Sequence, residues 1–169
     1  MFVLHTSTPE ETQAVASALA DLARPGDLLV LSGDLGAGKT TFTQGFARAL
    51  GVTEAVTSPT FVLHRAYRGR LDLHHLDVYR LDGPDDADDL DLAGLLEGDA
   101  VTLVEWGETI GGALPAERLT VHLALGAGDD DRILRVAPTG EAWSSRAGRL
   151  GDALAPWAVD ARQEAAARC

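Results

Sequence analysis

Short apolar runs alternate along the chain with segments of helical spacing. Residues 27–32 and 101–104 are almost continuously apolar, which is the pattern of strands buried on both faces of a sheet. Polar and apolar residues mix in 71–77, which predicts a strand with two different faces. Two further strands, 119–125 and 132–137, are predicted with a turn at 126–131 between them, and 61–63 is expected to be extended.

Helical segments are predicted between these strands. Thr8 is followed by proline and two glutamates, which is the pattern of a capped helix start, and apolar residues then recur at helical spacing up to residue 22. We expect a loop and then a short helix within 82–96. Another helix is predicted over 40–50, with three apolar residues on one side: Phe42, Phe46 and Leu50.

Strands that alternate with helices predict an α/β fold. We expect three layers, namely a mostly parallel central sheet with antiparallel additions and helices on both of its faces. Residues 1–140 are expected to form a single domain. Residues 141–169 are rich in alanine and arginine and predict a helical extension whose end is prone to disorder.

The composition is that of an ordinary globular protein, with 46% hydrophobic and 24% charged residues among 169. The start of the chain lacks the basic and apolar regions of a signal peptide, and no run reaches the roughly 18 apolar residues that a membrane span needs. The single cysteine, Cys169, cannot form a disulfide framework. We therefore expect a cytoplasmic enzyme with no membrane contact.

The net charge of −12 disfavours direct binding to nucleic acid, because such binding draws most of its affinity from lysine and arginine at phosphates. Any action on nucleic acid is expected to run through a partner. Thirteen of the fourteen basic residues are arginine, and Lys39 is the one lysine. We infer that this position requires a compact ammonium group rather than a planar guanidinium.

Residues 33–40 read Gly-Asp-Leu-Gly-Ala-Gly-Lys-Thr and match the phosphate-loop pattern G-x-x-x-x-G-K-[ST] in full. The glycines let backbone N–H groups converge on phosphate oxygens, and the following helix points its positive end at the same anion. Lys39 is expected to reach the β- and γ-phosphates, and the Thr40 hydroxyl to bind Mg²⁺. The pattern predicts a P-loop NTPase-like fold that binds ATP and Mg²⁺ on one loop, formed by Gly33, Asp34, Leu35, Gly36, Ala37, Gly38, Lys39, Thr40 and Thr41.

A magnesium nucleotide also needs a carboxylate at the end of a neighbouring strand. Asp77 follows the run 71–76, and Glu105 follows four apolar residues at 101–104. Either carboxylate can bind the ion directly or through water, and can orient an attacking water. The sequence leaves open which of the two contacts Mg²⁺.

Other features have equally simple structural interpretations. Ser58-Pro59-Thr60 can return a hydroxyl to the γ-phosphate side, although the tripeptide by itself indicates only a turn. His74 and His75 are adjacent on a strand and so point to opposite faces, which disfavours a shared metal site. The acidic run 85–89 is most simply a helix start, with a docking surface as the alternative. Trp106 is either a core residue or a contact of the site.

Other classes of phosphate-loop protein fit less well. A GTPase needs an N-K-x-D motif, and the only lysine is already part of the loop. A small-molecule kinase usually carries an arginine-rich lid, and no clear lid helix holds the arginines of this chain. A stand-alone kinase of this class remains the alternative, followed by a nucleotide sensor without turnover.

Four segments extend the pattern beyond the loop. In chain order they are residues 33–42, Ser58-Pro59-Thr60-Phe61, His75-Leu76-Asp77-Val78-Tyr79-Arg80-Leu81 and Val104-Glu105-Trp106. In order and spacing these segments resemble the TsaE (YjeE) family, and the resemblance covers residues 9–136. It implies a bacterial ATPase required for the threonylcarbamoyladenosine (t6A) modification of tRNA. The family acts with the proteins TsaB and TsaD, and TsaD holds the transferase site.

The resemblance also implies roles for individual residues. Lys39, Asp77 and Glu105 resemble the residues that catalysis requires, and Thr40 and Glu105 those that bind Mg²⁺. Four more residues are implied in nucleotide binding: Thr41 near the α-phosphate, Trp106 beside the site, and Pro9 and Glu10 near the adenine. ATP hydrolysis is expected to be slow, to be stimulated by the partners and to drive assembly or resetting of their complex, so that tRNA is reached only through it.

Overall fold

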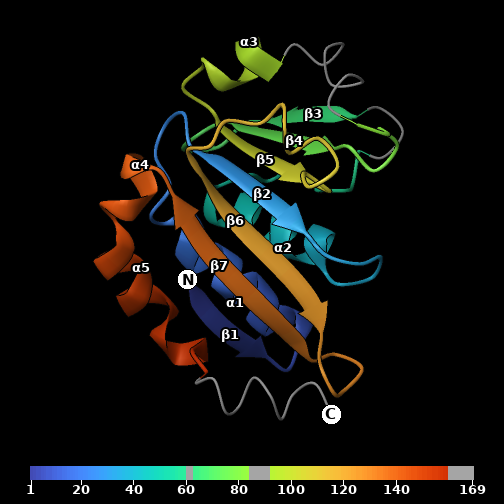
Figure 1. Cartoon of the computed structure of the whole chain (residues 1–169), viewed down its shortest axis with the longest axis vertical. Coiled ribbons are helices and arrows are strands. Elements are labelled where there is room, and N and C mark those ends of the chain that lie inside the picture. The colour runs from blue at the N-terminus through green and yellow to red at the C-terminus, as the bar shows by residue number, and fades with distance from the viewer. Residues whose placement is uncertain (60–62, 84–91, 160–169) are drawn as a thin grey trace.

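The computed structural model describes residues 1–59, 63–83 and 92–159 (Figure 1). Within these ranges the strands form one seven-stranded sheet in the order β1-β7-β6-β2-β5-β4-β3. The strands are β1 (Phe2–Thr6), β2 (Leu28–Ser32), β3 (His64–Tyr67), β4 (Leu73–Asp77), β5 (Val101–Glu105), β6 (Arg118–Leu125) and β7 (Arg132–Thr139). The helices are α1 (Pro9–Ala20), α2 (Lys39–Ala49), α3 (Leu92–Leu96), α4 (Glu141–Ser144) and α5 (Ala147–Leu154), followed by the 3₁₀ turn η2 (Ala155–Trp157).

The centre of the sheet is parallel. Strand β2 pairs in parallel with β5 and β6, and β4 pairs in parallel with β5. Antiparallel pairs lie toward both edges, where β7 joins β6 and β1, and β3 joins β4. The predicted α/β class is confirmed, with a parallel centre of the sheet and antiparallel additions toward both edges.

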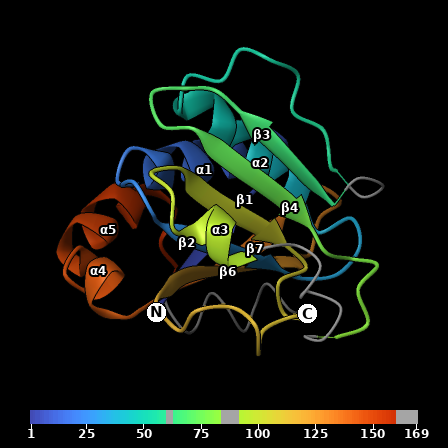
Figure 2. The same cartoon turned by 90° about the horizontal axis from the view of Figure 1, so that it is seen from above.

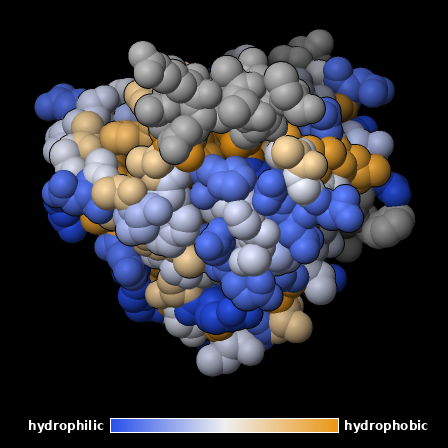
Figure 3. Space-filling model, turned by 90° about the horizontal axis from the view of Figure 1, so that it is seen from below, coloured by the Kyte–Doolittle hydropathy of each residue, from blue (hydrophilic) through white to orange (hydrophobic). Residues whose placement is uncertain are grey.

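Apolar residues gather on the two faces of this sheet. One cluster joins α1, α2 and α5 to one face and includes Phe42, Phe46 and Leu150; Figure 2 shows α1 and α2 side by side. A smaller cluster on the other face joins Val30 and Val104 to α3 and the segment after β5. Polar residues dominate the centre of the face seen in Figure 3. No helix in the described ranges is long and apolar enough to cross a membrane.

The predicted start of the first helix is confirmed. The Thr8 side chain accepts a hydrogen bond of 3.1 Å from the backbone N–H of Glu11, which satisfies one free donor of the first turn. Proline stands at the start of α1, where its missing N–H costs nothing. The helix that follows the phosphate loop, α2, begins one residue earlier than predicted and buries Phe42 and Phe46 completely.

Two strands lack a signal in the sequence analysis, namely β1 and β3. Both lie at the edges of the sheet and depend on a partner distant in sequence or on a hairpin. The expectation of extended backbone at 61–63 is wrong at Leu63, which has a left-handed φ of 64°. Residues 60–62, the acidic run 85–89 and the last ten residues of the chain lie outside the described residues.

A buried ion pair joins the segment after β7 to the start of β2. Arg146 donates to both carboxylate oxygens of Asp27, at 2.7 Å each, and to the carbonyls of Leu22 and Ala142, at 2.8 Å each. The guanidinium also lies over the Trp143 ring, 3.8 Å from its centroid. These contacts fix the turn before the strand that leads into the phosphate loop.

Candidate functional site

The carboxyl ends of the parallel strands meet at one edge of the sheet. Glu105 at the end of β5 pairs in register with Asp77 of β4 and with Leu31 of β2, and the glycine loop begins just after β2. Open α/β sheets bind ligands at this edge. A cavity of about 420 Å³ lies there, and it is lined by Leu35, Gly36, Gly38, Lys39, Thr40, Thr41, Ser58, Asp77, Tyr79, Glu105 and Trp106.

Two positions of the glycine loop favour glycine over a residue with a side chain. Gly33 has a φ of 125°, and a Cβ atom there would lie 2.0 Å from the carbonyl oxygen of Leu123. Gly38 has a φ of 102° at the position before α2, a left-handed conformation that glycine adopts without steric cost. The loop therefore turns tightly into the amino end of α2, as an anion cradle requires.

Lys39 lies inside this loop and is only 5% exposed. Its Nζ donates to the carbonyl oxygens of Gly33, at 2.6 Å, and Asp34, at 2.9 Å. The same Nζ lies 3.5 Å from the centroid of the Trp106 ring. Burial lowers the pKa of Lys39, while the nearby carboxylates, Glu105 foremost, act in the opposite direction. The ammonium group thus lies at the cavity, held by two carbonyl oxygens and the face of one aromatic ring.

Glu105 is buried and receives three hydrogen bonds, which divide its two oxygens. Oε1 lies 3.1 Å from the Thr43 hydroxyl and 2.9 Å from Nε2 of His75. Oε2 accepts from the Thr40 hydroxyl at 3.1 Å. The first oxygen is therefore tied to the protein interior, while the second faces the cavity together with Thr40.

Thr40 and Glu105 fit a magnesium ion. At metal–oxygen distances of about 2.1 Å, two adjacent corners of an octahedron lie about 3.0 Å apart. The 3.1 Å between Thr40 Oγ1 and Glu105 Oε2 matches that spacing. Both are oxygen ligands, which Mg²⁺ prefers.

Asp77 is the second carboxylate of the cavity and is 2% exposed. The Ser58 hydroxyl donates to its Oδ2, and the backbone N–H of Tyr79 donates to its Oδ1 at 3.1 Å. The structure thus brings Ser58 to the site beside Asp77, while Thr60 lies outside the described residues.

Trp106 lies over the lysine and also packs against the edge of the smaller apolar cluster. Its backbone has a left-handed φ of 63°, which costs a bulky residue about 1–2 kcal/mol. That conformation places the ring against Lys39 and within 4.9 Å of the Tyr79 ring, centroid to centroid. Strain of this kind is concentrated at functional sites.

A small second cavity of about 30 Å³ shares Gly38 and Thr41 with the first, and its lining includes Pro9 and Arg132. Glu10 is exposed and lines neither cavity. Of the two residues expected near the adenine, the structure therefore brings only Pro9 to the loop.

Sequence reasoning gave no role to Thr43 or Arg132, and it considered His75 only as a possible metal ligand and as part of a family segment. Thr43 follows Lys39 by one helical turn, and His75 precedes Asp77 by two residues of a strand. Residues at these spacings share a face, so Thr43 lies on the same side as Lys39, and His75 on the same side as Asp77. Arg132 donates from β7 to the carbonyls of Ala37, at 3.0 Å, and Gly36, at 3.3 Å. No spacing reveals that contact, because β7 lies far along the chain from the loop.

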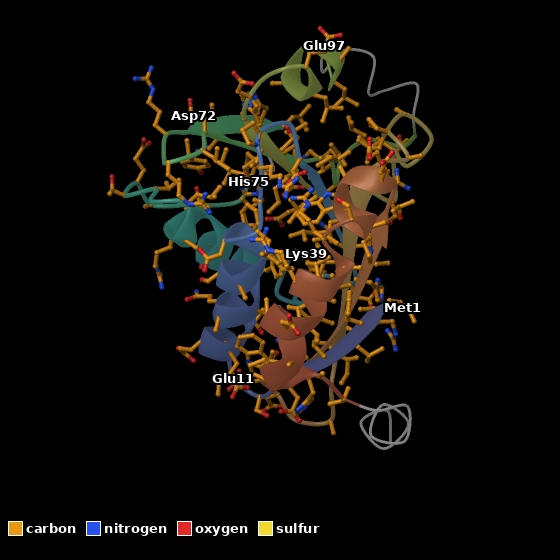
Figure 4. The ribbon with its side chains drawn as sticks, turned by 90° about the vertical axis from the view of Figure 1, so that its left-hand side faces the viewer. Met1, Glu11, Lys39, Asp72, His75 and Glu97 are labelled. Carbon is orange, nitrogen blue, oxygen red and sulfur yellow. The ribbon has the colours of Figure 1, made fainter. Side chains whose placement is uncertain are left out.

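His74 and His75 point to opposite faces of β4. His74 Nδ1 lies 3.0 Å from Nε2 of His64, whereas His75 reaches Glu105. Figure 4 shows His75 and Lys39 near the middle of the molecule, with Glu11 and Glu97 toward opposite ends. Within the described ranges no group of three or more His, Cys, Asp or Glu side chains is placed to hold a metal ion.

Comparisons with known proteins point to one family. Residues 6–133 match the sequence model of the family described as threonylcarbamoyl adenosine biosynthesis protein TsaE. The tRNA threonylcarbamoyladenosine biosynthesis protein TsaE of Bacillus subtilis is 49% identical over 136 residues, which cover 80% of this chain and 84% of that protein. The protein of the same name from Streptomyces coelicolor is 47% identical over 134 residues, covering 75% and 90%.

A solved structure is similar throughout. The crystal structure of Bacillus subtilis YdiB superposes with a TM-score of 0.77 at 42% identity, covering 89% of this chain and 93% of that one. The family match spans well over half of the chain, and it includes the glycine loop, Asp77 and Glu105. The chain is therefore a member of the TsaE family.

Proposed function

We propose that this protein binds ATP with Mg²⁺ in the cavity at the glycine loop and hydrolyses it slowly, in support of tRNA threonylcarbamoyladenosine modification. The observation that carries the proposal is the pairing of the Thr40 hydroxyl with Glu105 Oε2, 3.1 Å apart, beside the buried Lys39. A hydroxyl, a carboxylate and a lysine in this arrangement are the protein parts of phosphoryl transfer.

The charge of the cavity supports a role for Mg²⁺. Among the described lining residues, Lys39 is the only cation, and Asp77 and Glu105 are both anions. A triphosphate carries several negative charges, so these carboxylates would repel it without a divalent ion between them. Bound Mg²⁺ would neutralise charge that develops on the phosphate oxygens.

The protein's own residues would divide the work as follows. Backbone N–H groups of the loop and the amino end of α2 bind the phosphates. Lys39 leaves the carbonyls of Gly33 and Asp34 and donates instead to the β- and γ-phosphates, which are stronger acceptors. Thr40 and Glu105 would hold the metal, and we propose Glu105 as the carboxylate that the sequence left open. Asp77, held by Ser58 and the Tyr79 backbone, would orient an attacking water.

The family supports a proposal for the place of this activity in the cell. We propose that the protein acts with TsaB and TsaD, and that ATP turnover assembles or resets their complex. The net charge of −12 supports an indirect route to tRNA, because the chain carries few cations to spare for phosphate contacts.

The test is a phosphate-release assay on the purified chain, alone and with a TsaB–TsaD pair, with Lys39→Ala as the inactive control. We expect slow release by the chain alone, several-fold faster release with both partners, and no release by the control. Unchanged release with the partners, together with phosphate transfer to a small acceptor, would instead establish the stand-alone kinase.

A further inference from the structure

The buried histidine of β4 has a contact that the proposed function does not use. His75 is 0% exposed, and its Nε2 lies 2.9 Å from Oε1 of Glu105. Its other ring nitrogen, Nδ1, is buried without a hydrogen-bond partner in the described part of the chain. The ring packs near Tyr67, with the two centroids 6.4 Å apart.

The carboxylate locates a hydrogen on the ring. A carboxylate oxygen accepts hydrogen bonds and donates none, so Nε2, 2.9 Å from Glu105 Oε1, carries a hydrogen. His75 is therefore a hydrogen-bond donor to Glu105 Oε1.

Thr43 cannot replace this donor. Its hydroxyl lies 3.1 Å from Glu105 Oε1 but also 3.0 Å from the backbone carbonyl of Lys39, and it has one hydrogen to give. The His75 Nε2–H has only the carboxylate. His75 therefore donates to Oε1 alone, which holds that oxygen toward the interior and leaves Oε2 facing Thr40.

We propose that His75 is a positioning residue that orients Glu105 so that a single oxygen of its carboxylate is presented to Mg²⁺. This inference rests on the proposed function, because it assigns the metal to Thr40 and Glu105. Groups that orient a metal ligand typically contribute 10–100-fold to metal affinity or activity.

The experiment measures the magnesium enhancement, defined as the ratio of ADP affinities with and without MgCl₂ by calorimetric titration. His75→Gln and His75→Asn form the central pair, since both are polar. Only glutamine carries its amide N–H far enough to replace Nε2. We expect His75→Asn and His75→Leu to lower the enhancement about tenfold or more, and His75→Gln to retain most of it.

Two controls separate positioning from folding. His74→Leu changes the preceding residue of the same strand, whose side chain lies on the other face against His64. This variant should leave the enhancement unchanged. In a Glu105→Gln background, His75→Leu should produce no further loss, because its effect runs through that carboxylate. Should His75→Leu not fold, the glutamine and asparagine variants carry the test.

The outcomes separate the two proposals. Wild-type enhancement in His75→Asn, or an equal loss in the asparagine and glutamine variants, would overturn the positioning role while the proposed function stands. A further loss on adding His75→Leu to Glu105→Gln would also overturn it. A wild-type protein that binds ADP equally well with and without MgCl₂ would overturn both.

Discussion

Replacing Glu105 by glutamine tests the division of its two oxygens most directly. The glutamine carbonyl can take the place of Oε1, where it still accepts from His75 and Thr43. Its NH₂ group then takes the place of Oε2 and can donate to the Thr40 hydroxyl oxygen. All three contacts survive, but the group that faces the cavity is no longer an anionic ligand.

The structure predicts different losses of stability for the glutamine and alanine variants of Glu105. With glutamine, weaker neutral hydrogen bonds are offset by no longer burying a charge, so we expect a change in stability within about 1 kcal/mol. With alanine, the buried N–H of His75 loses its acceptor, at about 1–3 kcal/mol, and packing is lost as well. At roughly 2–4 °C per kcal/mol for a chain of this size, the lost hydrogen bond alone should lower the melting temperature of Glu105→Ala by about 2–12 °C.

The assays are thermal melting, ADP titration and phosphate release with TsaB and TsaD present. Glu105→Gln should fold and bind ADP, yet release phosphate at least about 100-fold more slowly, equivalent to about 2.7 kcal/mol. Equal melting temperatures for the glutamine and alanine variants would refute the hydrogen-bond reasoning. Wild-type phosphate release by the glutamine variant would refute the metal-ligand assignment.

Three further predictions concern other contacts. Lys39→Arg keeps the charge but cannot fit the carbonyl cradle as a compact ammonium does, so phosphate release should be abolished; near-normal release would contradict this. Asp27→Ala leaves the Arg146 guanidinium buried without its carboxylate and should cost about 3–5 kcal/mol in urea unfolding, most of it recovered by adding Arg146→Met; equal costs for the single and double variants would show that the pair is not coupled. The pKa of His64 is lowered by burial and then by its neighbouring histidines. Its contribution to stability is therefore complete above its ordinary pKa of 6.5 and is lost as the pH falls below that value. Melting temperatures from about pH 7 to 5 should fall less in His64→Gln than in the parent, and identical profiles would count against this shift.

Much of the site is readable from local sequence, because its parts follow one another at fixed spacings. The loop from Gly33 to Thr41 is contiguous, and the strand–loop–helix order around it sets its shape. Asp77 and Glu105 each end an apolar run, and the ends of parallel strands meet at one edge of a sheet. Residues such as Arg132 are different, since their contacts depend on which strands become neighbours.

The sequence by itself determined the α/β class and the glycine loop with its single lysine, because these depend on periodicity and on contiguous residues. It did not determine which carboxylate pairs with Thr40, where Trp106 lies, or which group His75 contacts. Those answers required the parallel pairing of β4 with β5, the left-handed backbone at Trp106 and the inward path of the Glu105 side chain. Each of them joins residues that are distant in the chain, and only the packed structure brings such residues within hydrogen-bond distance.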